Sequence, residues 1–166
     1  MEAIRLLSTS DKICWEMPIG MLIMFSAEFN CSIPFEMFGE KAICRYGIQL
    51  KGVTLYVTPV FNQSGLICLK SFFDHGEKAE QYQLLLGGIL SDFGEPVYKV
   101  HEKWERSSLT TYPCNIWVLS DSVLEVGIHE ERFIPFGYVT VTEKKNYKDI
   151  YTGSYLSRIG WAPKNI

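Results

Sequence analysis

Residues 42–73 have the sequence AICRYGIQLKGVTLYVTPVFNQSGLICLKSFF. Apolar and polar side chains alternate through this stretch, most regularly in residues 53–58, as in a strand with one buried and one solvated face. Lys51–Gly52 and Asn62–Gly65 interrupt the alternation with residue types that favour tight turns. The stretch therefore predicts three antiparallel strands joined by two short turns.

The hydrophobic period changes from strand to helix after this meander. Apolar residues recur at helical spacing at Tyr82, Leu85, Leu86, Ile89 and Phe93. Gly94 favours a helix end, and Pro96 prevents the helix from continuing. These features predict one central helix, about residues 76–93, that covers one face of the sheet.

The flanking segments add further strands. Upstream, the apolar run Met21–Phe25 predicts a buried central strand, with a short buried helix as the alternative, and Ser32–Gly39 predicts a loop. After the helix, a loop is expected at Glu105–Pro113, and strands are expected at Val97–Trp104, Cys114–Leu119, Val123–Glu130 and Phe133–Thr142. The tail from Glu143 places tyrosines at 147, 151 and 155, which suggests a short C-terminal helix. The expected fold is α+β, a mostly antiparallel sheet of seven or eight strands.

Bulk composition indicates an ordinary globular protein. The chain has 166 residues, of which 47% are hydrophobic and 21% charged, and no repeat or linker divides it. We therefore expect a single domain, residues 1–166. Five cysteines without a C-x-x-C pair favour a reducing compartment. The absence of a signal-like N-terminus or a membrane-length apolar run leads us to expect a soluble cytoplasmic protein without membrane contact.

Chemistry-bearing motifs are missing from the sequence. His75, His101 and His129 have no neighbouring residues that mark a catalytic site or a metal-ligand spacing. No Gly-rich phosphate loop is present, because Gly87–Gly88 lies inside the predicted helix. We therefore expect no enzyme activity, no cofactor and no bound metal. The net charge of −3 also disfavours general nucleic-acid binding.

Charge is unevenly distributed along the chain. Residues 73–131 hold eleven acidic and four basic residues, a net charge of −7, whereas residues 132–166 hold two acidic and six basic residues. Acidic groups around aromatic anchors suit docking onto a basic protein. The predicted partner-binding residues are Glu102, Trp104, Glu105, Tyr112, Asp121, Glu125, Glu130 and Glu131. The alternative interpretation is a charged surface that only keeps the protein in solution.

Residues 86–98, LGGILSDFGEPVY, followed by Trp104, combine a helix, a turn of the form aromatic-Gly-x-Pro and a strand. This layout, over about residues 42–130, resembles small bacterial immunity proteins of polymorphic and contact-dependent toxin systems. The resemblance implies a cytosolic, non-enzymatic inhibitor that occludes a cognate toxin, often a basic nuclease. It carries over no functional residue.

Two other functions remain open at this point. The aromatic content and the histidines allow a small-ligand-binding protein or enzyme with a pocket between helix and sheet. An edge strand or the tail could instead pair the chain with another subunit.

Overall fold

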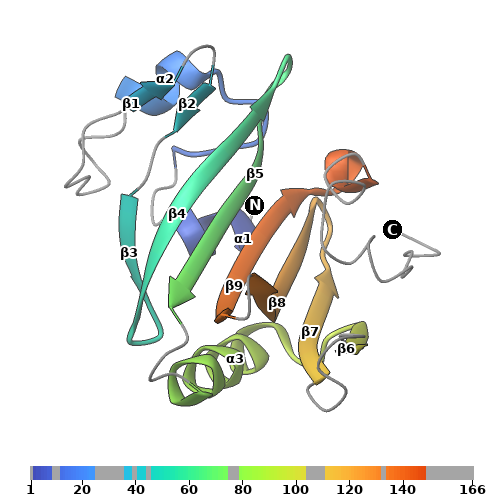
Figure 1. Ribbon diagram of the computed structural model, residues 1–166. Helices are drawn as coiled ribbons and strands as arrows, with labels where there is room; N and C mark the ends of the chain where they lie inside the picture. Colours follow the sequence, from blue (N-terminus) through green and yellow to red (C-terminus); the bar gives the residue numbers. More distant parts are fainter. Residues whose placement is uncertain are drawn as a thin grey trace.

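The computed structural model describes residues 2–8, 12–24, 36–38, 41–43, 46–74, 79–103, 111–131 and 134–148. Figure 1 shows a broad, twisted sheet with helices packed against it. The helices are α1 (Glu2–Ser8), α2 (Ile19–Met24), α3 (Ala79–Phe93) and the 3-10 turn η2 (Lys144–Asn146). The strands are β1 (Glu36–Phe38), β2 (Lys41–Ile43), β3 (Tyr46–Leu50), β4 (Val53–Asn62), β5 (Gly65–Asp74), β6 (Tyr98–Lys103), β7 (Thr111–Val118), β8 (Ser122–Glu131) and β9 (Ile134–Glu143).

The main sheet is antiparallel and has seven strands in the order β3-β4-β5-β9-β8-β7-β6. Two meanders form it, β3-β4-β5 before α3 and β6-β7-β8-β9 after it, and they join where β9 pairs with β5. The predicted α+β fold with an antiparallel sheet and a central helix is confirmed. Ten-residue strands at the join give it a long ladder of backbone hydrogen bonds.

The turns that the sequence predicts are present. Lys51 and Gly52 both have positive φ, 51° and 81°, which matches the two-residue hairpin turn whose twist suits a right-handed sheet. In β4, Val53 and Leu55 are buried while Thr54 is exposed, as the alternation predicts. The Gly94 stop is also confirmed, since Gly94 has a φ of 72° and donates to the carbonyl of Leu90 at 2.8 Å.

One face of the sheet, which we call the helix face, holds the hydrophobic core. Leu69, Val139 and Val126 occupy successive strands on this face and are fully buried. Apolar side chains of α1 and α3 cover this face and belong to the same core cluster. In Figure 1, α1 lies behind the sheet. The Nε1 of Trp117 donates to the carbonyl of Gly94 at 2.9 Å, which ties the end of α3 to β7.

The predicted strand at Met21–Phe25 is wrong, because Ile19–Met24 form α2. Pro18 precedes this helix, where its fixed φ suits a first turn, and the amides of Met21 and Leu22 bond to its carbonyl. Leu22 is buried in the core cluster whereas Met24 is 79% exposed, so only one side of α2 packs against the rest of the protein. A short apolar run without polar spacing does not distinguish helix from strand.

Strand boundaries differ from the predictions in three further places. The predicted loop Ser32–Gly39 contains β1, which pairs with β2 in a separate two-stranded sheet. The predicted strand through residues 42–50 is therefore divided between β2 and β3. The predicted loop Glu105–Pro113 ends earlier, since β7 begins at Thr111. Pairing of β7 with β8 starts at Cys114, so Pro113, which lacks an N–H, removes no hydrogen bond from that ladder.

Within the described part of the chain, no helix has the length and apolar character needed to cross a membrane.

Candidate functional site

Of the eight predicted partner-binding residues, the structure describes the side chains of two, Asp121 and Glu125. Glu102 and Tyr112 face each other in the β6–β7 register, and Glu130 and Glu131 end β8, so these four are placed by their backbone alone. Trp104 and Glu105 lie outside the described residues. The predicted acidic surface therefore stays a prediction for six of its members.

The prediction fails for Glu125, which is 7% exposed and cannot present charge to a partner. Its carboxylate accepts a hydrogen bond from the Tyr147 hydroxyl, and Tyr147 is itself 1% exposed. Burial raises the pKa of Glu125 from its usual 4.5 to about 6, although the Tyr147 hydrogen bond and the charge of Lys70 act in the opposite direction. Residues 122–128 are all buried, because both faces of the sheet are covered at β8.

Glu125 belongs to a polar row on the sheet face opposite α1 and α3. We call this the open face because it is exposed at Tyr56 and Phe72 on β4 and β5, although it is buried at β8. Lys70 of β5 and Glu125 of β8 both pair with Thr140 of β9. An adjacent row carries Tyr138, whose hydroxyl donates to the Cys114 sulfur at 3.1 Å. On the other side, Thr142 donates to the Cys68 sulfur at 3.3 Å. The sheet centre is thus polar on this face, in contrast to its apolar helix face.

The buried groups of this face are unsuited to nucleophilic catalysis. Burial raises the pKa of the Cys68 thiol to about 12 and the pKa of the Tyr138 hydroxyl well above its ordinary value. A thiol with so high a pKa carries almost no thiolate at neutral pH. Cys68 and Cys114 form no disulfide and are buried, so each packs as a small hydrophobic residue. Among the described residues, no group of three His, Cys, Asp or Glu side chains forms a metal site.

Glu125→Gln is expected to make stability less dependent on pH. Between pH 4.5 and pH 6 the folded chain keeps a proton on Glu125 that the unfolded chain has released, so raising the pH favours unfolding. The shift corresponds to about 2 kcal/mol. We expect the free energy of unfolding of Glu125→Gln, relative to the parent chain, to rise by about that amount between pH 4 and pH 7. Urea unfolding at several pH values measures this change, and a pH-independent difference would contradict a buried carboxylate with a raised pKa.

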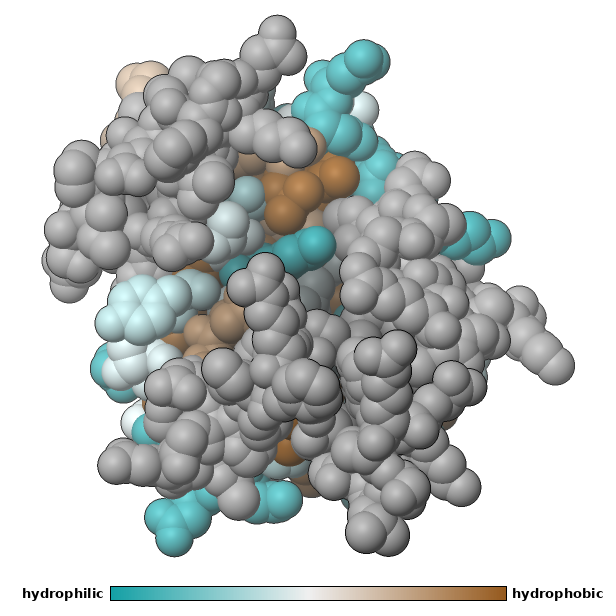
Figure 2. Space-filling view, in the orientation of Figure 1, coloured by the Kyte–Doolittle hydropathy of each residue, from teal (hydrophilic) through white to brown (hydrophobic). Residues whose placement is uncertain are grey.

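The open face also carries an exposed aromatic pair, Tyr56 and Phe72, that the charge-based prediction missed. These residues are direct cross-strand partners on β4 and β5, and they are 54% and 47% exposed. Half-buried Lys70 and Thr58 form the next cross-strand pair on the same face. Figure 2 shows hydrophilic and hydrophobic side chains next to one another on this face. The alternation of residues 53–58 places Tyr56 on the solvated side of its strand, so the sequence does contain a signal for the exposure of this residue.

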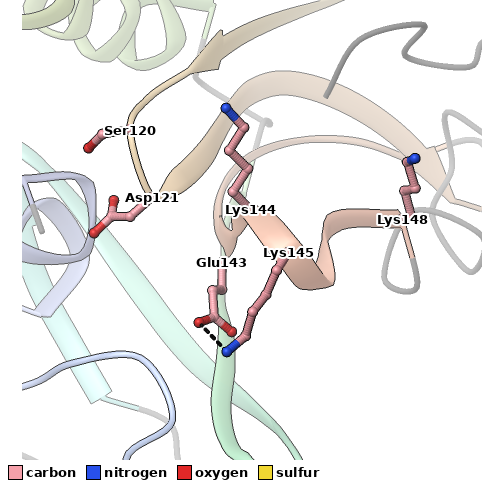
Figure 3. Close-up of a pocket in the computed structure, with 6 residues that line it drawn as sticks. All are labelled: Ser120, Asp121, Glu143, Lys144, Lys145 and Lys148. Atoms are coloured by element: carbon pink, nitrogen blue, oxygen red, sulfur yellow. Dashed lines mark ion pairs between the residues drawn. The ribbon is translucent and has the colours of Figure 1, made fainter.

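A second feature is a pocket of about 480 Å³ at the end of the sheet. The turn between β7 and β8 provides Ser120 and Asp121, and the region of η2 provides Glu143, Lys144, Lys145 and Lys148 (Figure 3). The amide of Lys144 bonds to the carbonyl of Asp121 at 2.9 Å, which holds the two segments together. Asp121 is thus the one predicted residue that the structure places in a described pocket.

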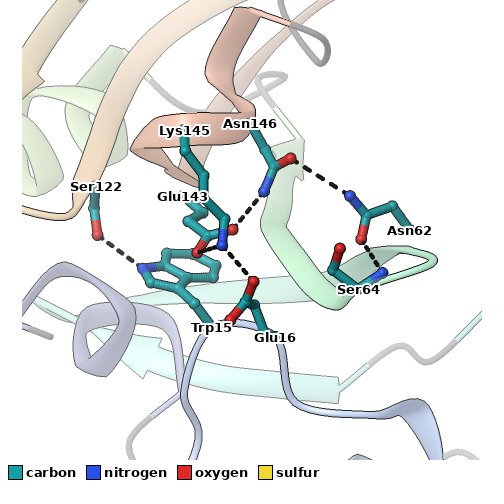
Figure 4. Close-up of polar contacts among 8 residues, drawn as sticks. All are labelled: Trp15, Glu16, Asn62, Ser64, Ser122, Glu143, Lys145 and Asn146. Carbon is teal, nitrogen blue, oxygen red and sulfur yellow. Dashed lines mark hydrogen bonds and ion pairs between the residues drawn. The ribbon is translucent and has the colours of Figure 1, made fainter.

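A network of polar contacts beside this pocket fixes the segment before α2 (Figure 4). The Nε1 of Trp15 donates to the Ser122 hydroxyl at 3.2 Å, and that hydroxyl donates to Asp121 at 2.6 Å. Lys145 forms ion pairs with Glu16 and Glu143. The network joins three parts of the chain that are distant in sequence, so no local motif predicts it.

Comparison of the chain with protein-family models, with curated proteins and with solved structures found no match.

Proposed function

We propose that this chain is a non-enzymatic binding protein that docks a protein partner on the open face of its sheet. The observation that carries the proposal is the exposed cross-strand pair Tyr56 and Phe72. Aromatic side chains provide large contact areas with few rotatable bonds, and they are enriched among the residues that dominate binding energies. Their position on two ten-residue strands holds them in place before a partner arrives.

Lys70 adds charge to this surface. It pairs with Thr58 on the Tyr56–Phe72 side, and one strand, β9, separates it from the buried Glu125. An aromatic centre with a charged neighbour matches the usual arrangement of an apolar core and a polar rim in a protein interface. The described open face thus offers the parts of a binding surface without the parts of a catalytic one.

The narrower form of the proposal is an immunity protein that occludes a cognate basic toxin in the cytosol. Its support is the resemblance of residues 42–130 and the net charge of −7 over residues 73–131. Buried free thiols at Cys68 and Cys114 fit a reducing compartment. Glu125 is buried and Asp121 accepts the Ser122 hydroxyl in a pocket. The acidic contribution to docking therefore rests on Glu102, Glu105, Glu130 and Glu131, with Trp104 and Tyr112 as anchors.

The competing idea of a ligand pocket between helix and sheet receives no support from the described residues. Tyr82, Leu85 and Ile89 of α3 are buried in the apolar cluster of the helix face. The hydroxyl of Tyr82 accepts a hydrogen bond from Asn115 at 3.0 Å, so its polar group is occupied within the interface. In the described residues, the interface between α3 and the sheet is therefore a packed core and not a ligand pocket.

Replacing the aromatic pair is expected to weaken partner binding strongly. We expect Tyr56→Ser with Phe72→Ser to raise the Kd for the partner by about tenfold to a hundredfold. The partner tested first is the polypeptide encoded next to this chain, since immunity proteins of the kind it resembles are encoded beside their toxins. Calorimetry on the purified proteins measures the Kd.

Leu84→Ser is the matched control, because Leu84 is a similarly exposed apolar residue on α3. It should leave the Kd unchanged. Charge reversal at Glu102 and Glu105 in the same assay tests the acidic contribution, through its effect on how the Kd changes with salt concentration. Tight binding that survives the aromatic double variant would exclude the open face as the docking surface. Absence of any complex would reject the immunity proposal in its present form.

A further inference from the structure

The pocket between the β7–β8 turn and η2 contains two uncompensated ammonium groups. Lys145 is occupied by its ion pairs with Glu16 and Glu143. By contrast, the ammonium groups of Lys144 and Lys148 take part in none of the hydrogen bonds or ion pairs of the described residues. The pocket therefore has positive charge that no side chain in the described part of the chain neutralises.

Both carboxylates of the pocket are engaged inside the protein. Glu143 is 7% exposed and interacts with Lys145, at 3.2 Å, and with the amide of Asn146. Asp121 accepts the Ser122 hydroxyl at 2.6 Å. These contacts turn the carboxylates towards internal donors, so they offset little of the charge that Lys144 and Lys148 present to a ligand.

Both of these ammonium groups border the same pocket. Lys144 is the first residue of the 3-10 turn η2 and Lys148 follows the end of that turn, and both line the pocket. Figure 3 shows the side chains of Lys144 and Lys148 apart from each other and turned away from Glu143, whereas Lys145 turns towards Glu143. A multivalent anion bound in the pocket would compensate both positive charges.

We propose that this pocket binds a small molecule carrying a phosphate or diphosphate group. Lysine ammonium groups bind phosphate as point charges, and the exposed hydroxyl of Ser120 is a further donor at the pocket wall. The volume of about 480 Å³ exceeds that of a lone phosphate and falls in the range typical of small-ligand sites. This site lies apart from Tyr56 and Phe72 and is independent of the proposed partner.

A nucleic-acid strand fits this pocket less well than a small phosphate. Single-strand binding combines basic grooves with aromatic faces on which bases stack. Tyr147, the aromatic residue between Lys145 and Lys148, is 1% exposed and donates its hydroxyl to Glu125. It therefore offers no stacking face to a base.

The test is titration calorimetry with inorganic pyrophosphate at low ionic strength. We expect saturable binding to the unmodified chain and a Kd at least about tenfold higher for Lys144→Gln with Lys148→Gln. Lys99→Gln is the matched control, because Lys99 is an exposed lysine of β6 outside the pocket, and it should leave the Kd unchanged. Thermal unfolding of each variant verifies folding, and Lys148→Gln alone replaces the double variant if the latter unfolds.

Three outcomes would overturn the proposal. The first is absence of saturable pyrophosphate binding, and the second is an equal loss of affinity in Lys99→Gln. The third is tighter binding of a single-stranded oligoribonucleotide that strengthens with its length, which would assign the lysines to nucleic acid.

Discussion

Gly65→Ala is expected to lower the free energy of unfolding by at least about 3 kcal/mol. Gly65 begins β5 with a φ of 121°, a conformation that L side chains rarely adopt. A Cβ at this position would lie 2.3 Å from the carbonyl oxygen of Glu16 and 2.8 Å from that of Met17. These are backbone atoms, so no side-chain rotation relieves the clash.

Relief of that clash requires the segment before α2 to move away from β5. The movement would break two backbone hydrogen bonds of 2.9 Å, from Glu16 to Leu66 and from Leu66 to Met17. Chemical denaturation of the parent chain and the variant measures the loss. Gly94→Ala is the control, since Gly94 also has positive φ, 72°, but has no atom within 4 Å of its Cβ position. We expect the control to lose only about 1–2 kcal/mol, and equal losses would show that the contact with Glu16 is unimportant.

Glu125→Lys is expected to destabilise the fold by at least about 3 kcal/mol. The substitution places an ammonium group at a position that is 7% exposed, on the same sheet face as Lys70. It also removes the acceptor for the buried Tyr147 hydroxyl. A buried charge without a partner is among the most costly defects that a single substitution introduces.

The matched control is Glu95→Lys, which makes the same charge change at an exposed site. Glu95 pairs with Lys99 across an i,i+4 spacing at 2.7 Å, and such exposed pairs contribute less than about 1 kcal/mol. Thermal and urea unfolding of both variants should therefore separate burial from net charge. If Glu125→Lys were as stable as Glu95→Lys, Glu125 would be accessible to solvent and would return to the predicted acidic surface.

The case of Glu125 shows why charge alone misplaced a site residue. In β8, Val123 and Glu125 lie on one face of the sheet together with Gly127, and Leu124 and Val126 lie on the other. When apolar residues precede and follow a single glutamate along a strand, the pattern indicates a buried carboxylate as much as a surface one. Whether Glu125 is buried depends on whether the open face is covered at β8. Tyr147, which is 22 residues away in sequence, contributes to that cover.

The helix α3 and the long hairpins could be predicted because their causes are local. Period-two alternation in residues 53–58, turn residues at Lys51–Gly52 and a helix stop at Gly94 each act within a few residues. The short elements α2, β1 and β2 could not be predicted. Runs of three to six residues have no measurable period, so distant contacts select their conformation.

The amino-acid order by itself determined the antiparallel α+β class, the central helix and the helix-covered apolar face, since these follow from which neighbouring side chains avoid water. Only the tertiary structure decided that β9 pairs with β5, that Glu125 is buried against Tyr147, and that Lys144 and Lys148 share a pocket with Ser120. Each of these depends on segments far apart in the chain, and their meeting is set by the packing of the whole sheet, which no local pattern encodes.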